Sequence, residues 1–367
     1  MLIQTIIAAS LVATASTQPP PQDQAFFAIF AETKVGRMAG MPAMDLGDLP
    51  PGFSLPPEAM MFSGQAVRTL NIRLWSPSIA PPGATAWVAP PAGLKQGQRL
   101  DLELYRPEAE KKPEKIGDFD PDSNPDSFTI KIYWGSSDTV KPGQPKVITW
   151  SGLDPAYREA MRNQMREANA SASSYHYKDG WTTGYWPTKK QPGKIDKTAS
   201  LVGKYVLTTS YTGNVEIEAP SNVNFLAPFE ISAPNLDDEI DLKKAIAFRW
   251  KEIPNALGLH ASAFGMEGKN TLIIWVSSEV FDDMIMGDTG FLQMAEVRDY
   301  VSRNIFMAGN KANVTIPAGI FAKADFAMMQ MTGYGPGAAL DQAQPLPRIQ
   351  TKTSLMVMLG GKGMFGK

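Results

Sequence analysis

The sequence has no cysteine and only two histidines, His176 and His260, among its 367 residues. The lack of cysteine excludes disulfides, thiolate metal sites, cysteine nucleophiles and a lipid-modified cysteine. A zinc site would need carboxylates from scattered positions beside the histidines. The chain also has no HExxH, phosphate-loop, dinucleotide-binding or GxSxG pattern. We therefore expect no cofactor, and no linear motif indicates an enzyme class.

An excess of charge of one sign is also missing. Lys and Arg number 35 against 37 Asp and Glu, which gives a net charge of -2. Such a balance gives no field that would attract nucleic acid or an anionic membrane. No later segment has the roughly 20 apolar residues that a membrane helix needs. We expect no nucleic-acid partner and no transmembrane segment in the mature chain.

Residues 2–15, "LIQTIIAASLVATA", are uncharged and mostly apolar, and the polar "STQPPPQDQ" follows them. This segment is too short to span a bilayer but fits the apolar region of a secretory signal, with "ATA" as the small residues before cleavage. The usual Lys or Arg near the start is missing, and a buried first strand is the alternative. We expect residues 1–15 to be a signal peptide and the mature protein to be periplasmic or secreted.

The next residues, 16–64, are rich in Pro, Gly, Met and Ala and show no sustained periodicity. We expect a flexible arm here, in which only "AFFAIFAE" near residues 26–32 suits a short ordered element. From residue 66 onward, "VRTLNIRLW" and "FTIKIYW" alternate apolar and polar side chains between Pro-Gly turns. This pattern indicates half-buried strands of antiparallel β-sandwiches or barrels.

The length of the chain suits two domains. We predict a mainly β fold with two antiparallel β-sandwich-like domains and a short helical insertion. The first domain covers residues 65–226 and carries a helical and aromatic insertion at 151–200. Its helix is expected at 154–172, where Asp154 and Pro155 start a helical pattern. The aromatic stretch after it is either an exposed binding platform or a loop buried over a sheet.

The second domain covers residues 227–360, with a helix near 289–304 and strands near 313–317, 325–332 and 349–358. A strand that holds Phe248 and Trp250, then a Pro-Asn turn and a hairpin, resemble a fibronectin type III or immunoglobulin-like sandwich. This is an analogy of fold and implies no activity. Residues 361–367 form a Gly-rich tail.

One pattern occurs twice: "YWGSSD" at 133–138 and "IWVSSE" at 274–279 both contain Trp, any residue, two Ser and a carboxylate. If "GMEGKN" turns a hairpin with Gly265 opposite Thr271, His260 falls opposite about Val276 and near Ser277. Ser277 or Ser278, His260 and Glu279 would then be nucleophile, base and orienting acid. No nucleophile elbow or oxyanion loop accompanies them. The structural alternative is two strand ends whose Trp fills the core and whose polar groups bind their own turns.

The segment "DFDPDSNPD" alternates oxygen ligands as the start of a calcium loop does. The candidate ligands are Asp120, Asp122, Asn124 and Asp126. Pro125 stands where the loop needs glycine, and Lys131 stands where it needs a bidentate Glu. A solvated linker into the following strand is the favoured interpretation.

Several short landmarks occur together in order between residue 66 and the end of the chain. They are "RTLNIRLW", "YWGSSD" followed by "KPGQPKVI", "ASLVGKY", "FRWKEIPNALG", "IIWVSSE", "VTIPAGIF", "MTGYGP" and "LMVMLGGKGMFGK". In these the chain resembles a family of exported bacterial proteins, notably from alphaproteobacteria, for which no activity is established. The family pattern reads Trp-Gly-Cys-Gly-Glu where this chain has Ser136, Ser137 and Asp138, and it has an aromatic residue at the position of His260. The resemblance implies an envelope or secreted location and argues against the triad.

The sequence thus favours a non-catalytic binding or envelope-structural protein. Its partner would be a polymer or a protein, such as a polysaccharide or an envelope protein, held by exposed loops or strand edges. The alternative is a secreted or periplasmic hydrolase whose carboxylates converge only in the fold, since such pairs leave no linear motif.

Overall fold

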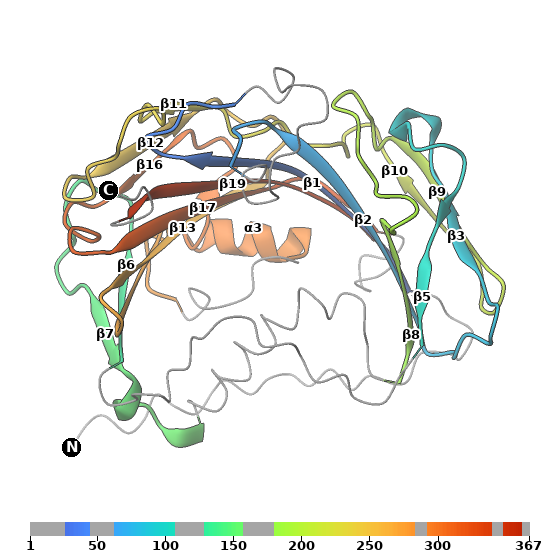
Figure 1. The fold of residues 1–367 in the computed structure, drawn as a ribbon, viewed down its shortest axis with the longest axis horizontal. Helices are drawn as coiled ribbons and strands as arrows, with labels where there is room; N and C mark the ends of the chain where they lie inside the picture. The colour runs from blue at the N-terminus through green and yellow to red at the C-terminus, as the bar shows by residue number, and fades with distance from the viewer. Residues whose placement is uncertain are drawn as a thin grey trace.

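A strongly curved twelve-stranded sheet dominates the computed structural model, which describes residues 26–44, 62–106, 128–156, 180–282, 292–339 and 348–361. Figure 1 shows the helix α3 (Met294–Ser302) on the concave side of this sheet and two smaller sheets on its convex side. The expected mainly β, sandwich-like fold with a short helix is confirmed.

Ten strands form the continuous path of the large sheet. In order they are β5 (Glu103–Tyr105), β8 (Thr182–Trp186), β2 (Val67–Ser76), β1 (Phe26–Met38), β19 (Arg348–Gly361), β17 (Phe326–Tyr334), β13 (Gly258–Glu267), β14 (Thr271–Val276), β6 (Thr129–Trp134) and β7 (Lys146–Thr149). Off this path, β15 (Met307–Ala308) pairs with β13, and β18 (Ala338–Ala339) pairs with β19. The pairs β1–β19 and β14–β6 are parallel, and the other pairs on the path are antiparallel.

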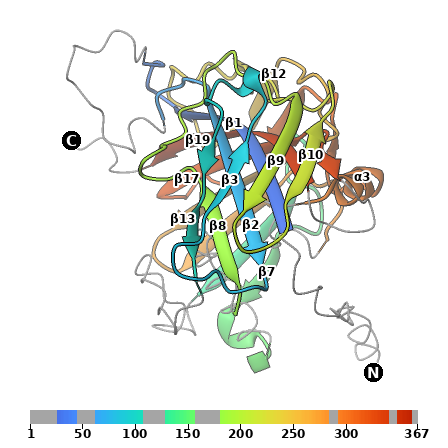
Figure 2. The same ribbon diagram turned by 90° about the vertical axis from the view of Figure 1, so that its right-hand side faces the viewer.

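Two smaller sheets cover the convex face of the large one. The four-stranded sheet has the order β10 (Val215–Ala219), β9 (Gly203–Thr209), β3 (Ala86–Ala89) and β4 (Leu100–Asp101). The three-stranded sheet has the order β11 (Ile231–Ala233), β12 (Ile246–Trp250) and β16 (Asn313–Ile316). Figure 2 shows β3, β9 and β10 in front of β2 and β8. Short 3-10 turns occur at Ala92–Leu94 and Trp150–Gly152.

Each small sheet encloses a hydrophobic core against its half of the large sheet. Under the four-stranded sheet, Ile72 of β2 and Leu207 of β9 are fully buried. Under the three-stranded sheet, Phe248 of β12 and Trp275 of β14 are fully buried. A buried side chain of this size contributes about 1.5–3 kcal/mol. The alternation of apolar residues therefore identified β2 and β6 correctly. The apolar side of β2 lies on the convex face, whereas Ile132 of β6 lies on the opposite face from Trp275, in a separate core cluster.

Residues 26–38 do not belong to a flexible arm, contrary to the sequence-based expectation. They form β1, which pairs with β2 on one side and with β19 on the other. Ala31, Thr33 and Val35 continue the buried side of this strand beyond the apolar "AFFAIF". Small and hydroxyl side chains on that side weaken the hydrophobic alternation, which concealed the strand. Residues 16–25 and 45–61 of the predicted arm lie outside the described residues.

The aromatic stretch that was read as a loop contains β8, so that interpretation is wrong for residues 182–186. Trp186 at its end is fully buried. The helix near 289–304 is confirmed as α3, and the strands near 313–317, 325–332 and 349–358 are confirmed as β16, β17 and β19. The helix at 154–172 falls mostly outside the described residues, as does the signal peptide, and only the first residue of the tail is described. The fibronectin-like or immunoglobulin-like assignment stays a prediction.

The large sheet is shared by the two predicted domains. β6 and β7, from the first, lie beside β14, from the second, at one end of the sheet. At the centre of the large sheet, β1 from the start of the described chain pairs with β19 from its end. In the described part of the chain, no helix combines the length and apolar character needed to cross a membrane.

Candidate functional site

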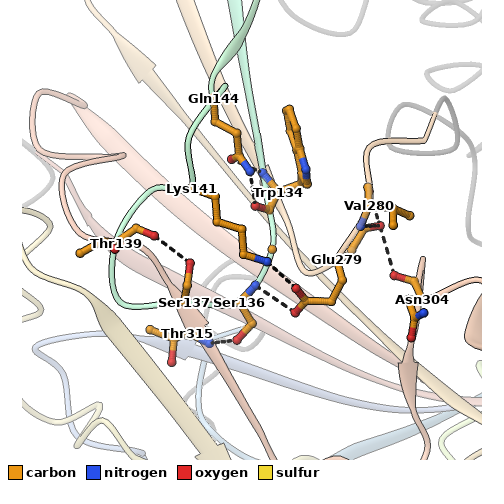
Figure 3. Close-up of polar contacts among 12 residues, drawn as sticks. Trp134, Ser136, Ser137, Thr139, Lys141, Gln144, Glu279, Val280, Asn304 and Thr315 are labelled. Atoms are coloured by element: carbon orange, nitrogen blue, oxygen red, sulfur yellow. Dashed lines mark hydrogen bonds and ion pairs between the residues drawn. The ribbon is translucent and has the colours of Figure 1, made fainter.

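The two Trp-x-Ser-Ser-acid stretches end two neighbouring parallel strands. Trp275 of β14 lies opposite Tyr133 of β6, and Val276 lies opposite Trp134, so the two patterns are offset by one residue. Because parallel strands run in the same direction, both stretches leave the sheet at the same edge. Figure 3 shows the polar contacts that result.

Three contacts hold the two strand ends together. The indole N–H of Trp275 donates to the carbonyl oxygen of Gly135 at 2.9 Å. The backbone N–H of Ser136 donates to the Glu279 carboxylate at 3.3 Å, and Lys141 Nζ forms an ion pair with the other oxygen of that carboxylate at 2.6 Å. The repeated pattern is therefore a mutual clamp between two strand ends.

The surroundings hold the clamp in place. The side-chain amide of Gln144 accepts from Trp134 N at 2.9 Å and donates to Trp134 O at 2.8 Å. The Trp134 ring packs edge-on against Phe281 at 5.0 Å, and Lys146 Nζ lies 4.1 Å from the Phe281 ring centre. Gly135 has φ +94, a conformation that favours glycine.

The catalytic candidates are occupied with structural contacts. Ser277 is buried and its Oγ accepts the Ala261 N–H at 3.0 Å, while Ser278 Oγ donates to Val280 O at 2.6 Å. Glu279 is bound by the clamp. His260 lies opposite Thr332 of β17 and packs on Phe306, with ring centres 4.9 Å apart. Among the described residues, no hydrogen bond joins any two of Ser277, His260 and Glu279.

The expected hairpin register was wrong by two residues. Ser262, and not His260, lies opposite Val276, and Glu267 lies opposite Thr271. Burial lowers the pKa of His260 from 6.5 to about 4. The imidazole is therefore neutral at pH 7 and a weak base.

The calcium candidates, residues 120–126, lie outside the described residues. In the part of the chain that the structure describes, no three His, Asp or Glu side chains lie close enough together to hold a metal ion.

The concave face carries a feature that sequence reasoning missed, which we call the aromatic band. It consists of Phe26 of β1, Trp75 of β2, Tyr105 of β5 and Tyr185 of β8. Phe26 lies opposite Trp75, and Thr183 of β8 lies opposite both Trp75 and Tyr105. Three members of the band therefore share one row across four strands. All four side chains are partly exposed. They point away from the convex core because Phe27 and Leu74, the next residues on β1 and β2, are buried in it.

A polar cluster lies at one end of the aromatic band. The rings of Tyr105 and Tyr185 are stacked at 5.1 Å and their hydroxyls are 2.7 Å apart. Each hydroxyl is also 3.2 Å from an oxygen of the exposed Glu103 carboxylate. Burial, followed by the hydrogen bond to Tyr185, raises the pKa of Tyr105. The carboxylate oxygens of Glu103 have lone pairs beyond these two contacts, so the cluster can accept a hydrogen bond from a ligand hydroxyl.

Arg73 of β2 lies opposite Tyr185 of β8 and contacts its ring. Its guanidinium donates to the carbonyl oxygens of Ile72 and Trp186 and lies 5.6 Å from the Tyr185 ring centre. It is 6% exposed, so it stiffens the platform and is not a free cation for a ligand.

No protein-family model matches this chain, and none of the curated proteins does.

Proposed function

We propose that the protein is an exported, non-catalytic binding protein and that the aromatic band holds an envelope polysaccharide. One observation carries this proposal: Tyr105 and Tyr185 are stacked on a shared carboxylate, and Tyr105 lies in one row with Trp75 and Phe26. Export rests on the leader-like first residues and on the family resemblance.

The chemistry of the band suits a sugar chain. Pyranose rings present apolar C–H faces, which pack on aromatic rings, and hydroxyls at their edges, which bind carboxylates and phenols. Tyr105, Tyr185 and Glu103 supply both kinds of contact within one cluster.

The arrangement is also ordered in advance. Strand pairing fixes the spacing of Phe26, Trp75 and Tyr105, and the contacts to Arg73 and Glu103 hold Tyr185. A ligand therefore immobilises few additional side chains, which reduces the free-energy cost of binding.

The polar side chains at the ends of β6 and β14 are engaged in structural contacts, which agrees with a binding role. The hydroxyl of Ser277 is bonded to backbone and the carboxylate of Glu279 is bonded to Lys141. Neither group is poised as a nucleophile or a general acid, so we favour binding over hydrolysis.

The test is a sedimentation assay with purified peptidoglycan sacculi and with cellulose. Trp75→Ala and Tyr185→Ala should each weaken binding to at least one polymer about tenfold. Trp87→Ala is the matched control, because Trp87 is a partly exposed tryptophan of β3 outside the band. Equal losses in Trp75→Ala and Trp87→Ala, or no binding to any polysaccharide, would contradict the proposal.

A further inference from the structure

A pocket of about 150 Å³ lies between the start of α3 and the large sheet, and it includes no residue of the aromatic band. Its walls come from the first turns of α3, from the segment after β17 and from the first residues of β19. Tyr334, which is stacked on Phe306 at 5.4 Å, lines it as well. Gly337 lets the segment after β17 pass close to the start of β19, because a Cβ there would be 2.3 Å from Ile349 O.

Two guanidinium groups give the pocket a positive character. Arg298 of α3 and Arg348 of β19 both line it. Arg348 lies 5.5 Å from the ring centre of Phe30, which limits its movement. Within the described residues, Arg298 makes no ion pair, because Glu296 accepts the N–H of Gln293 and Asp299 binds Arg303.

The start of α3 adds to this character. Met294 and Ala295, which line the pocket, are the first two residues of the helix, whose backbone N–H groups have no acceptor one turn earlier. The helix dipole places partial positive charge at the same end. An anionic group is therefore the favoured occupant.

The pocket also offers one acceptor with no donor. Gln350 Nε2 donates to Leu292 O at 2.5 Å, which fixes the orientation of the amide. The other end of the amide, Oε1, is buried and has no hydrogen-bond partner among the residues that the structure describes. An unpaired buried acceptor is costly, so a ligand hydroxyl that donates to it would bind with a clear advantage.

From these three observations we infer that the pocket binds a small 2-hydroxy carboxylate. The carboxylate pairs with Arg298 and Arg348 at the start of α3, and the adjacent hydroxyl donates to Gln350 Oε1. A dry engineered cavity of similar volume in another protein accepts benzene, so the pocket has room for about six non-hydrogen atoms. Lactate has this size, and larger hydroxy acids can extend from the open side.

The experiment uses the full chain, titrated by calorimetry with lactate, propionate and lactamide. Lactate should bind with a Kd on the order of 1 mM or tighter. Propionate lacks the hydroxyl and should bind at least about fivefold more weakly, and neutral lactamide should show no binding. Arg298→Gln should weaken lactate at least about tenfold, whereas Arg249→Gln, an exposed arginine on β12 with the same charge change, should leave it unchanged.

Gln350→Met tests the hydroxyl contact separately. This variant should bind propionate as the parent does and should lose the preference for lactate. Thermal unfolding of each variant shows whether it is folded. Lactate that binds no better than lactamide, or a lactate Kd unaffected by Arg298→Gln, would overturn the inference. Because polysaccharide sedimentation depends on different residues, either proposal can fail without the other.

Discussion

The indole N–H of Trp275 on β14 donates to the carbonyl oxygen of Gly135 at the end of the neighbouring strand β6, at 2.9 Å and 140 residues away in the sequence. Trp275 is fully buried, so this bond forms where water cannot replace it. It fixes the end of β6 against the end of β14. The repeated Trp-x-Ser-Ser-acid pattern is thereby explained as a structural junction.

The junction predicts an unequal cost for two tryptophan substitutions. Trp275→Phe removes the donor to Gly135 and leaves that oxygen unpaired. Trp250→Phe removes a buried indole N–H that has no hydrogen-bond partner in the described part of the chain, and so provides the control. Both variants lose similar volume, so Trp275→Phe should be more destabilising by about 1–2 kcal/mol, as measured by urea unfolding. Equal losses would show that the bond contributes nothing.

The two serine positions should also differ. Ser277→Ala leaves the buried Ala261 N–H without its acceptor and should cost about 1–3 kcal/mol. Ser137→Ala, in the other copy of the pattern, removes an exposed bond to Thr139 O and should cost less than about 0.5 kcal/mol. Chemical denaturation of both variants measures these values. A larger loss for Ser137→Ala would contradict our description of the junction.

Glu279→Gln tests whether the ion pair matters for stability. The side chains of Lys141 and Glu279 are 40% and 49% exposed, so solvent screens their attraction. We expect a loss below about 1 kcal/mol, and a smaller one in 1 M salt. Lys204→Gln, which breaks the exposed pair with Glu216, is the matched control. A loss of several kcal/mol confined to Glu279→Gln would mean that the carboxylate has a further role.

Sequence periodicity identified strands well because a two-residue repeat follows directly from burial on one face. The alternation at 67–75 and 129–134 predicted β2 and β6. Register was harder to predict. The turn between β13 and β14 is shorter than assumed, because Gly268 at φ +63 reverses the chain only after Glu267. That difference moved Ser262 into the place expected for His260.

The aromatic band and the pocket could not be predicted in this way. Trp75 was visible at the end of a predicted strand and Tyr185 in the aromatic stretch that was read as a loop. They come together only through the strand order β5, β8, β2, β1. Neither spacing nor composition encodes which strands pair at long range. The pocket likewise depends on α3 packing beside β19, and Arg298 and Gln350 belong to no linear motif.

β1 provides a test of the central correction to the fold. Ile29→Ala should cost about 2–5 kcal/mol, because Ile29 is fully buried in the core under the four-stranded sheet. Met41 belongs to the same predicted arm, but its side chain is 38% exposed. Met41→Ala should therefore lower the free energy of unfolding by less than about 0.5 kcal/mol. Circular dichroism during urea unfolding measures both. A flexible arm would make the two variants equally harmless.

His260 predicts how stability depends on pH. Its pKa is lowered to about 4 in the folded state by burial, whereas the unfolded chain should titrate near 6.5. Between pH 6.5 and 4 the unfolded state binds a proton that the folded state does not. The contribution of His260 to the free energy of unfolding therefore falls as the pH falls through this range, and it is constant below pH 4. The total loss is up to about 3 kcal/mol. His260→Phe keeps a ring against Phe306 and removes the titration. The difference in unfolding free energy between the two proteins should therefore change between pH 6.5 and 4. The carboxylates are the same in both proteins, so their contributions cancel. A difference that stays constant would mean that His260 titrates normally.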